Sequence, residues 1–262
     1  MPEMFANALG YEQLMGRWSV RLAPLYTDFA RLRDGGRILD VGCGTGALIK
    51  TIADKTRTSE IVGIDPAQSF INYARTRFND PRIVLEAGDA VQLPFPAAHF
   101  EQTLSLLVMM FVPQPERAAN EMKRVTRPGG TVSACTWHRD KLELTSIFWE
   151  EACKLDPGAD ARAQRPKHSN REGQLAALWQ LAGLVDVEET AISMQLPFTS
   201  FKDFWEPHLC GVAPQGAYVA SLSDERREAL RKALHSRILG GRQDGAFTLT
   251  ATALAVRGTV PR

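Results

Sequence analysis

The chain has little of what marks several large classes of protein. Its 262 residues include only four cysteines, which lie far apart and form no C-x-x-C pair, so neither a disulfide framework nor a zinc site is expected. The 31 lysines and arginines are balanced by 30 aspartates and glutamates, a net charge of +1 that leaves no surplus for binding a nucleic acid backbone. No apolar run approaches the roughly 18 residues that would predict a membrane span.

The first residues also lack a basic stretch followed by an apolar run, the pattern of a secretion signal, so we expect a cytoplasmic protein. These absences favour a small-molecule partner over nucleic acid or membrane, with the chain acting as a monomer or a homodimer. What is present is ordinary globular composition, 44% apolar over 262 residues, which is enough for one sizeable core.

The first half of the chain alternates short apolar runs with amphipathic stretches, which predicts a parallel sheet whose strands are joined by helices. Apolar runs predict strands at residues 37–41, 61–64, 82–85, 99–107 and 130–136. Helical spacing of apolar residues predicts helices at residues 47–53, 67–78 and 115–125.

The second half is less regular. Residues 169–182 predict a helix stopped by Gly183, and the strand that begins at Val185 changes its apolar phase between Ala191 and Ile192, which predicts a bulge or a strong twist. Residues 247–256 predict the final strand. Because no crossover helix of the earlier kind separates these two strands, we expect them to close the sheet as an antiparallel edge.

The expected fold is therefore α/β, a doubly wound, mostly parallel, seven-stranded Rossmann-like sheet with an antiparallel edge strand and a partial helical cap. Residues 1–36 are expected to form an N-terminal helical segment and residues 37–262 one domain, with cap or lid insertions at about 138–170 and 198–241. Two readings of the insertions' aromatic residues stay open: they line an apolar lid over a ligand, or they fix the insertions to the core or to a second subunit. These aromatics are Trp137, Phe148, Trp149, Phe198, Phe201, Phe204, Trp205 and Tyr218.

The strongest motif is ILDVGCGTG at residues 38–46, an acidic residue at a strand end followed by three alternate glycines that open a helix. Such glycines let the backbone approach a ligand closely. A nicotinamide-binding turn would space them G-x-G-x-x-G, whereas here the third glycine comes early and Ala47 follows it. The Asp40 carboxylate beside the turn also favours a ligand with a positive group over a pyrophosphate.

Further motifs follow in order. Asp65 lies at the end of the second predicted strand, 19 residues after Gly46. Gly-Asp-Ala follows the third strand at residues 88–90, Ser-Leu-Leu ends the fourth at residues 105–107, and Arg-Pro-Gly-Gly precedes the fifth at residues 127–130. With these motifs, residues 11–137 resemble the class I S-adenosylmethionine-dependent methyltransferases, of the small-molecule type related to ubiquinone and menaquinone biosynthesis.

The resemblance implies S-adenosylmethionine as cofactor, S-adenosylhomocysteine as product, and methyl transfer to oxygen, nitrogen or carbon of a small hydrophobic or aromatic acceptor. An aspartate matching Asp65 accepts both hydroxyls of the cofactor's ribose, and one matching Asp89 accepts from its adenine amine. Upstream, an arginine at position 17 pairs with the methionine carboxylate, and an aromatic ring at position 11 faces the sulfonium. The implied cofactor residues are Tyr11, Arg17, Asp40, Gly42, Gly44, Thr45, Gly46, Asp65, Pro66, Gly88, Asp89, Ala90, Ser105 and Leu106.

Methyl transfer needs a general base only when the acceptor must lose a proton. His138 is the candidate, because it follows the fifth strand at the edge of the expected crevice. His99 begins the fourth strand and is expected at the opposite end of the sheet, whereas His168 and His208 lie in the insertions, where a lid would bring either inward.

Two alternatives from other classes remain. In the first alternative, the chain is a cofactor-binding module or sensor that methylates no acceptor. In the second, it is a nicotinamide-dependent oxidoreductase, which the early third glycine disfavours. The Asn/Asp-Pro-Pro-Tyr motif of enzymes that methylate nucleic acid bases is absent, since residues 105–108 read SLLV. This difference agrees with the balanced charge in arguing against a nucleic acid substrate.

Overall fold

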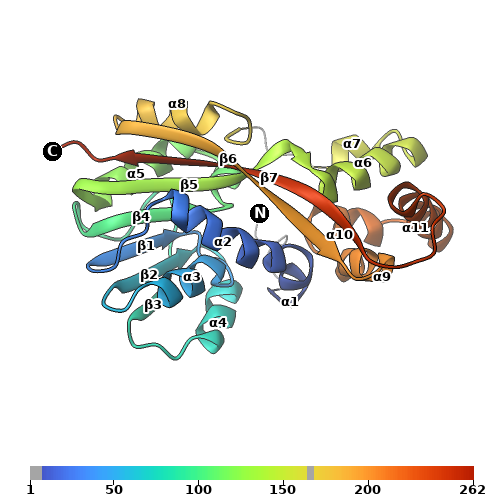
Figure 1. Cartoon of the computed structure of the whole chain (residues 1–262), viewed down its shortest axis with the longest axis horizontal. Coiled ribbons are helices and arrows are strands. Elements are labelled where there is room, and N and C mark those ends of the chain that lie inside the picture. The colour runs from blue at the N-terminus through green and yellow to red at the C-terminus, as the bar shows by residue number, and fades with distance from the viewer. Residues whose placement is uncertain (1–7, 164–167) are drawn as a thin grey trace.

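A single seven-stranded sheet organises the protein in the computed structural model, which describes residues 8–163 and 168–262 (Figure 1). The order across the sheet is β3-β2-β1-β4-β5-β7-β6. The strands are β1 (Arg37–Val41), β2 (Glu60–Asp65), β3 (Ile83–Ala87), β4 (Phe100–Leu106), β5 (Thr126–Leu142), β6 (Val185–Phe198) and β7 (Phe247–Thr259).

Strands β1 to β5 are parallel to one another, whereas β7 runs antiparallel between β5 and the outermost strand β6. The chain order reverses between β1 and β4, where parallel α/β sheets leave a crevice at the carboxyl ends of their strands. The expected doubly wound sheet with antiparallel pairing at one edge is confirmed.

Helices cover both faces of the sheet (Figure 1). One face packs against α2 (Arg17–Phe29), α3 (Ala47–Lys55) and α4 (Gln68–Arg77), and the other against α5 (Pro115–Val125) and α8 (Gln174–Leu181). Each face has its own buried apolar core, so the sheet is covered on both sides, as a mostly parallel sheet requires.

Helix α5 has the bounds that its sequence predicts, residues 115–125. Proline is compatible with the first turn of a helix because that position needs no backbone donor, and Pro115 occupies it here. Ala118, Ala119, Met122 and Val125 recur at helical spacing and are fully buried against the sheet. The apolar stripe therefore determines both the helix and the face it buries.

The N-terminal segment consists of α1 (Ala8–Tyr11), a π-helical turn η2 (Glu12–Gly16) and α2. The predicted segment 1–36 is helical over these elements, and residues 1–7 lie outside the described residues. Among the described residues, no helix is both long and apolar enough to cross a membrane.

The insertions form a helical cap, carried by the ends of β6 and β7 that project beyond the sheet (Figure 1). Contacts of α6 with α10 and α11, and of α7 with α10, join the two insertions to each other. The first contains α6 (Glu143–Leu155) and α7 (Ala159–Arg162), and the second α9 (Phe201–Trp205), η4 (Glu206–Cys210), α10 (Ala213–Ala220) and α11 (Asp224–Leu239).

Of the two alternatives predicted for β6 between Ala191 and Ile192, a bulge or a strong twist, the bulge is not found there. Pairing of β6 with β7 continues without a shift through Ala191 and Ile192, and the irregularity lies between Val185 and Glu188, where Asp186 has φ +50°. Most of β6 is exposed or half-buried, so the core does not fix which of its residues face inward. The apolar phase of such a strand is therefore a poor guide to its register.

Candidate functional site

The glycine turn after β1 has a backbone that only glycine adopts without strain. Gly42, Gly44 and Gly46 have φ values of +77°, +53° and +94°. The amides of Gly42 and Cys43 both donate to the Ile64 carbonyl at 2.8 Å, which ties the turn to the end of β2. The turn is thereby held at the carboxyl edge of the sheet.

Side chains are also excluded from the turn by its surroundings. A Cβ atom on Gly42 would lie 2.4 Å from Val108, and one on Gly46 would lie 2.5 Å from the Phe78 ring. Both distances are far inside van der Waals contact. The alternate glycines in the sequence thus reflect a close packing of the turn as well as its backbone conformation.

Asp40, at the end of β1, is buried, and neither of its carboxyl oxygens has a hydrogen-bond partner among the described residues. Burial raises the pKa of Asp40 well above its ordinary value, and the negative charge of Asp65 adds to the rise. A buried polar group without a partner costs stability, and such groups concentrate at functional sites. This carboxyl group fits a bound ligand that brings its own donor.

Asp65, at the end of β2, has partners for both carboxylate oxygens. Its Oδ2 accepts from the Gly44 amide at 3.0 Å and its Oδ1 from the Ala67 amide at 2.8 Å. Burial raises the pKa of Asp65, although these two hydrogen bonds oppose the rise. The carboxylate is therefore fixed against the glycine turn, where its remaining lone pairs suit a pair of ligand hydroxyls.

The N-terminal segment lies over this turn. The Tyr11 ring packs on Phe70 of α4, with 5.3 Å between ring centroids. The Glu12 carboxylate accepts a hydrogen bond from the Thr45 hydroxyl and lies 3.4 Å from the Arg77 guanidinium, which itself donates to the Thr45 carbonyl at 2.9 Å. Glu12 and Arg77 were not identified from the sequence, since nothing marks a charge pair that forms between distant segments.

Arg17 joins the N-terminal segment to the cap. Its Nη1 donates to Asp203 Oδ1 at 2.6 Å, and its guanidinium lies over the rings of Trp18 and Phe198, 4.3 Å and 4.7 Å from their centroids. The pairing with a methionine carboxylate that the family resemblance implies stays a prediction. In this structure the Arg17 guanidinium forms an ion pair with Asp203, another residue that was not identified from the sequence.

The other predicted cofactor residues line the carboxyl edge or support it. Asp89 is exposed after β3, and its Oδ1 accepts from the Val91 amide at 3.1 Å. Ser105 is fully buried, and its hydroxyl donates to the Val41 carbonyl at 2.9 Å, which ties β4 to β1. Beside them, Pro66 is exposed, Gly88 half-buried, and Ala90 and Leu106 buried.

His138, the predicted base, has both ring nitrogens engaged. Nδ1 accepts from the Asp140 amide at 3.1 Å, so the neutral ring carries its proton on Nε2, which donates to Glu172 at 2.8 Å. Glu172 also binds Lys141 at 2.8 Å, and the lysine and then the histidine lower the pKa of Glu172 to about 2. These contacts tie the end of β5 to the segment just before α8.

We expect His138→Ala to keep methyl transfer within about threefold of wild type, because a general base contributes 10²-fold or more and this ring is already hydrogen-bonded. Initial rates with a working acceptor would measure the effect. Glu172→Ala is the matched control, since it removes the same contact from the other side. A loss of 10²-fold or more in His138→Ala alone would show that the histidine is the base, as the sequence predicts.

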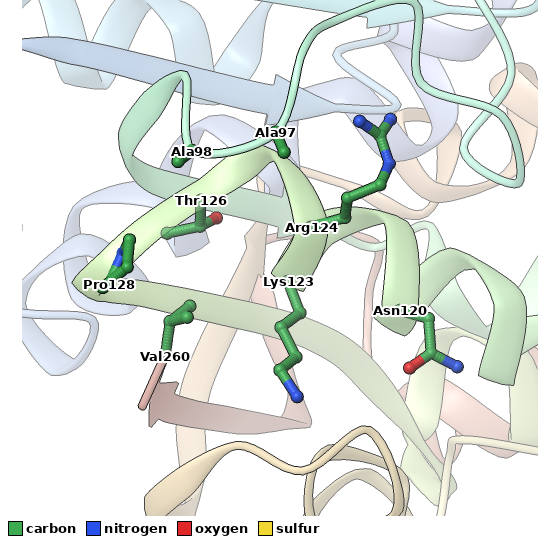
Figure 2. A pocket seen from close by; sticks show the side chains of 8 residues that line it. All are labelled: Ala97, Ala98, Asn120, Lys123, Arg124, Thr126, Pro128 and Val260. Atoms are coloured by element: carbon green, nitrogen blue, oxygen red, sulfur yellow. The ribbon is translucent and has the colours of Figure 1, made fainter. Parts of the chain in front are cut away.

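A shallow open depression lies at the other end of the sheet, with a volume of about 420 Å³ (Figure 2). It is lined by the start of β5 and by residues such as Lys123 and Val260. The Lys123 ammonium already donates to the Ala182 carbonyl at 2.8 Å. This depression is remote from the glycine turn and is not part of the candidate site.

Fold and site together define a class. A mostly parallel seven-stranded sheet, a glycine turn after β1 and acidic residues ending β1 and β2 are the features of a Rossmann-like, class I methyltransferase domain. Residues 39–134 match the family model described as a methyltransferase domain. This stretch of the chain is therefore similar to a methyltransferase domain.

Two curated relatives share this region. A fatty-acid O-methyltransferase from Mycolicibacterium smegmatis is 34% identical over 118 residues, 44% of this chain and 42% of the relative. A phosphatidylethanolamine N-methyltransferase from Cereibacter sphaeroides is 33% identical over 118 residues, 43% of this chain and 57% of the relative. The chain thus spans about half the length of the curated relatives it matches.

Solved structures extend the likeness over nearly the whole chain. The YcgJ protein of Bacillus subtilis has a TM-score of 0.58 at 16% identity, covering 94% of this chain and 99% of its own. A phosphoethanolamine N-methyltransferase of Haemonchus contortus, in complex with phosphomonomethylethanolamine and S-adenosylhomocysteine, has a TM-score of 0.60 at 18% identity, covering 97% and 57%. A cyclase named SpnF has a TM-score of 0.57 at 20% identity, covering 93% and 81%, so the fold by itself does not define the reaction.

Proposed function

We propose that the protein binds S-adenosylmethionine at the glycine turn and transfers its methyl group to a small acceptor with an apolar or aromatic body. The observation that carries this proposal is the buried carboxyl of Asp40, which has no hydrogen-bond partner in the described part of the chain and lies beside a turn that only glycine adopts without strain. A ligand with an ammonium group would supply the missing donor. The family match and the acidic residue at the end of β2 support the same cofactor.

The chain's own residues would hold the cofactor and shape the site around it. Asp40 would receive the amino group, Asp65 the ribose hydroxyls and Asp89 the adenine amine, while Tyr11 would cover the site from the N-terminal segment. The cofactor supplies the activated methyl group, so the protein's task is to align the acceptor and exclude water. None of these roles requires a metal ion.

An apolar or aromatic acceptor is supported by the cap. Its aromatic rings are buried and pack with Trp18 of the N-terminal segment into the larger apolar core, beside the carboxyl edge of the sheet. Both named curated relatives also act on lipid-like molecules according to their names, a fatty acid and a phospholipid. An acceptor with a substantial apolar body fits this surrounding.

Replacing Asp65 by alanine is expected to weaken binding of S-adenosylmethionine by tenfold or more, because two hydrogen bonds to an ionised group are lost. Calorimetric titration of the purified protein measures this directly. Asp54→Ala is the control, because it removes an exposed carboxylate on α3 that pairs with Lys50. Unchanged affinity in Asp65→Ala would remove this residue from the site.

The same titration tests the proposal as a whole. Micromolar binding of S-adenosylmethionine and S-adenosylhomocysteine, with no binding of a nicotinamide dinucleotide, is the expected result. Binding of the dinucleotide alone would establish an oxidoreductase instead. Cofactor binding without transfer to any acceptor would point to a binding module or sensor.

A further inference from the structure

The glycine turn holds a carboxylate in this structure, and that carboxylate comes from the N-terminal segment. The Thr45 hydroxyl donates to Glu12 Oε1, and the Arg77 guanidinium, at the end of α4, lies 3.4 Å from the same oxygen. Arg77 Nη1 also donates to the Thr45 carbonyl at 2.9 Å. A hydroxyl and a guanidinium therefore converge on one carboxylate oxygen at the turn.

The backbone of the N-terminal segment makes room for this carboxylate. Glu12 begins the π-helical turn η2, which ends at Gly16. A Cβ atom on Gly16 would lie 2.6 Å from Glu12 Oε1, so a side chain there would push the carboxylate away from Thr45. Single π-helical turns are rare and occur frequently at functional sites. The glycine and the irregular turn together allow Glu12 to reach the glycine turn.

Water reaches the contact between Glu12 and Arg77. Their side chains are 20% and 26% exposed, so solvent screens the attraction between the two charges. Ion pairs of this kind contribute little to the stability of a fold. Another carboxylate is therefore able to replace Glu12 on the same two donors while the fold stays intact.

Glu12 also brings a negative charge close to Asp65. Burial raises the pKa of Tyr11, a hydrogen bond with Ser19 lowers it, and the charges of Glu12 and Asp65 raise it further. Both carboxylates therefore act on the same phenol. Their mutual repulsion opposes the contact of Glu12 with the turn and favours its release.

Arg17, to which the family resemblance assigns the methionine carboxylate, is engaged in a different place. Its Nη1 donates to Asp203 of the cap at 2.6 Å, and its guanidinium lies over the rings of Trp18 and Phe198. These contacts join the N-terminal segment to the cap. In this structure Arg77, and not Arg17, binds a carboxylate at the glycine turn.

We propose that Thr45 and Arg77 bind the carboxylate of the cofactor's methionine part, and that Glu12 occupies their site until the cofactor displaces it. This inference rests on the proposed function. The two carboxylates have the same chemistry, because each accepts from a hydroxyl and from a guanidinium. Glu12 is thus an intramolecular competitor of the cofactor, and its contact with the turn is autoinhibitory.

Two ligands that differ by one group test the proposal: S-adenosylhomocysteine and S-adenosyl-3-thiopropylamine, the same molecule without its carboxylate. Each is titrated calorimetrically into the purified protein, and the ratio of the two dissociation constants measures the advantage of the carboxylate. In wild type this advantage is expected to stay within about threefold, because the ligand's carboxylate replaces one of the protein's own.

Removing the competitor is expected to reveal the full advantage. Glu12→Gln keeps the shape of the side chain without its charge, and we expect it to bind S-adenosylhomocysteine about threefold to tenfold more tightly than wild type. Binding of the decarboxylated ligand is expected to stay within about twofold. Gly16→Ala displaces the Glu12 carboxylate by steric contact and is expected to act in the same direction.

Double variants identify the arginine. Adding Arg77→Gln to Glu12→Gln is expected to remove the advantage of the carboxylate, whereas Arg77→Gln alone has a smaller effect, because it weakens both competitors. Arg75→Gln, added to Glu12→Gln, is the control, since this arginine of the same helix donates to the Leu85 carbonyl. Retained affinity for the decarboxylated ligand shows that each variant is folded.

The outcomes separate this inference from the proposed function. An unchanged ratio in Glu12→Gln would overturn the inference, and so would an advantage that is lost with Arg17→Gln but kept with Arg77→Gln in the Glu12→Gln background. Weaker binding of both ligands by Glu12→Gln would show that Glu12 supports the closed site instead of competing for it. Wild-type protein that binds neither ligand would sink the proposed function itself.

Discussion

Ligand-free Asp40→Asn is expected to unfold at a higher temperature than wild type while binding S-adenosylmethionine more weakly. In the wild-type fold this carboxyl is buried and has no hydrogen-bond partner within residues 8–163 and 168–262, and its pKa is raised well above the ordinary value, mainly by burial. A raised pKa means that folding favours the protonated form. The contribution of the protonated Asp40 carboxyl to the free energy of unfolding is complete below the ordinary pKa near 4 and is lost as the pH rises.

At neutral pH an asparagine avoids that loss, because it has no charge to bury. We expect a gain on the order of 1–3 kcal/mol in the free energy of unfolding, or several degrees in melting temperature for a chain of this size. Loss of a charge-assisted hydrogen bond would weaken cofactor binding by roughly tenfold to a hundredfold. Scanning fluorimetry and calorimetry measure the two effects.

Asp65→Asn is the matched control, with the same chemical change one strand away. Asp65 accepts from two backbone amides, and an asparagine would leave one of them without an acceptor. This variant is therefore expected to lower the melting temperature. The same sign in both variants would show that the burial of Asp40 does not carry the cost assigned to it.

Acidification is expected to destabilise the wild-type protein more than His208→Gln between about pH 6.5 and 4. The pKa of His208 falls from about 6.5 to about 4 on folding, mainly because of burial. A depressed histidine pKa stabilises the fold fully above pH 6.5, and this stabilisation is lost as the pH falls toward 4, because the unfolded chain binds the extra proton. The shift corresponds to at most about 3 kcal/mol.

Only the difference in melting temperature between wild type and His208→Gln reports the contribution of this histidine alone. Arg17 and its partner Asp203 lie on the elements that face it, and the raised pKa of Asp40 gives the opposite slope above about pH 4. The melting temperatures of both proteins would be measured between about pH 6.5 and 4. As the pH falls, the melting temperature of wild type is expected to drop by on the order of 5–10 °C more than that of His208→Gln. Parallel curves would mean that His208 is protonated in the folded protein as easily as in the unfolded chain.

Much of the first half of the fold was predictable because its signals are local. The bounds of β1 and α5 match the sequence prediction, since an apolar run that enters a glycine turn and a helical apolar stripe opened by proline both depend on neighbouring residues. The end of β5 was underestimated: the strand continues to Leu142, where its residues pair with β7 from far along the chain. Pairing between strands that are distant in the chain leaves no signal in the local sequence.

The residues of the candidate site likewise include some that could be predicted from the local sequence and others that could not. The glycine turn and Asp65 follow from spacing along the chain, and the structure brings them within hydrogen-bond distance of each other. The roles of the histidines do not follow from spacing, because they depend on partners such as Glu172, 34 residues from His138. Whether a ring nitrogen is occupied or bare is decided by tertiary packing, which a single sequence does not reveal.

The insertion of β7 between β5 and β6 has a consequence for the order of folding. During synthesis β6 emerges before β7, and the strand beside which it finally lies does not yet exist. Its growing edge is then an open template for other nascent chains. The residues of β6 are mostly exposed or half-buried, and the strand carries carboxylates at Glu188 and Glu189. Their negative charge opposes association of β6 with other copies of itself before β7 has been synthesised.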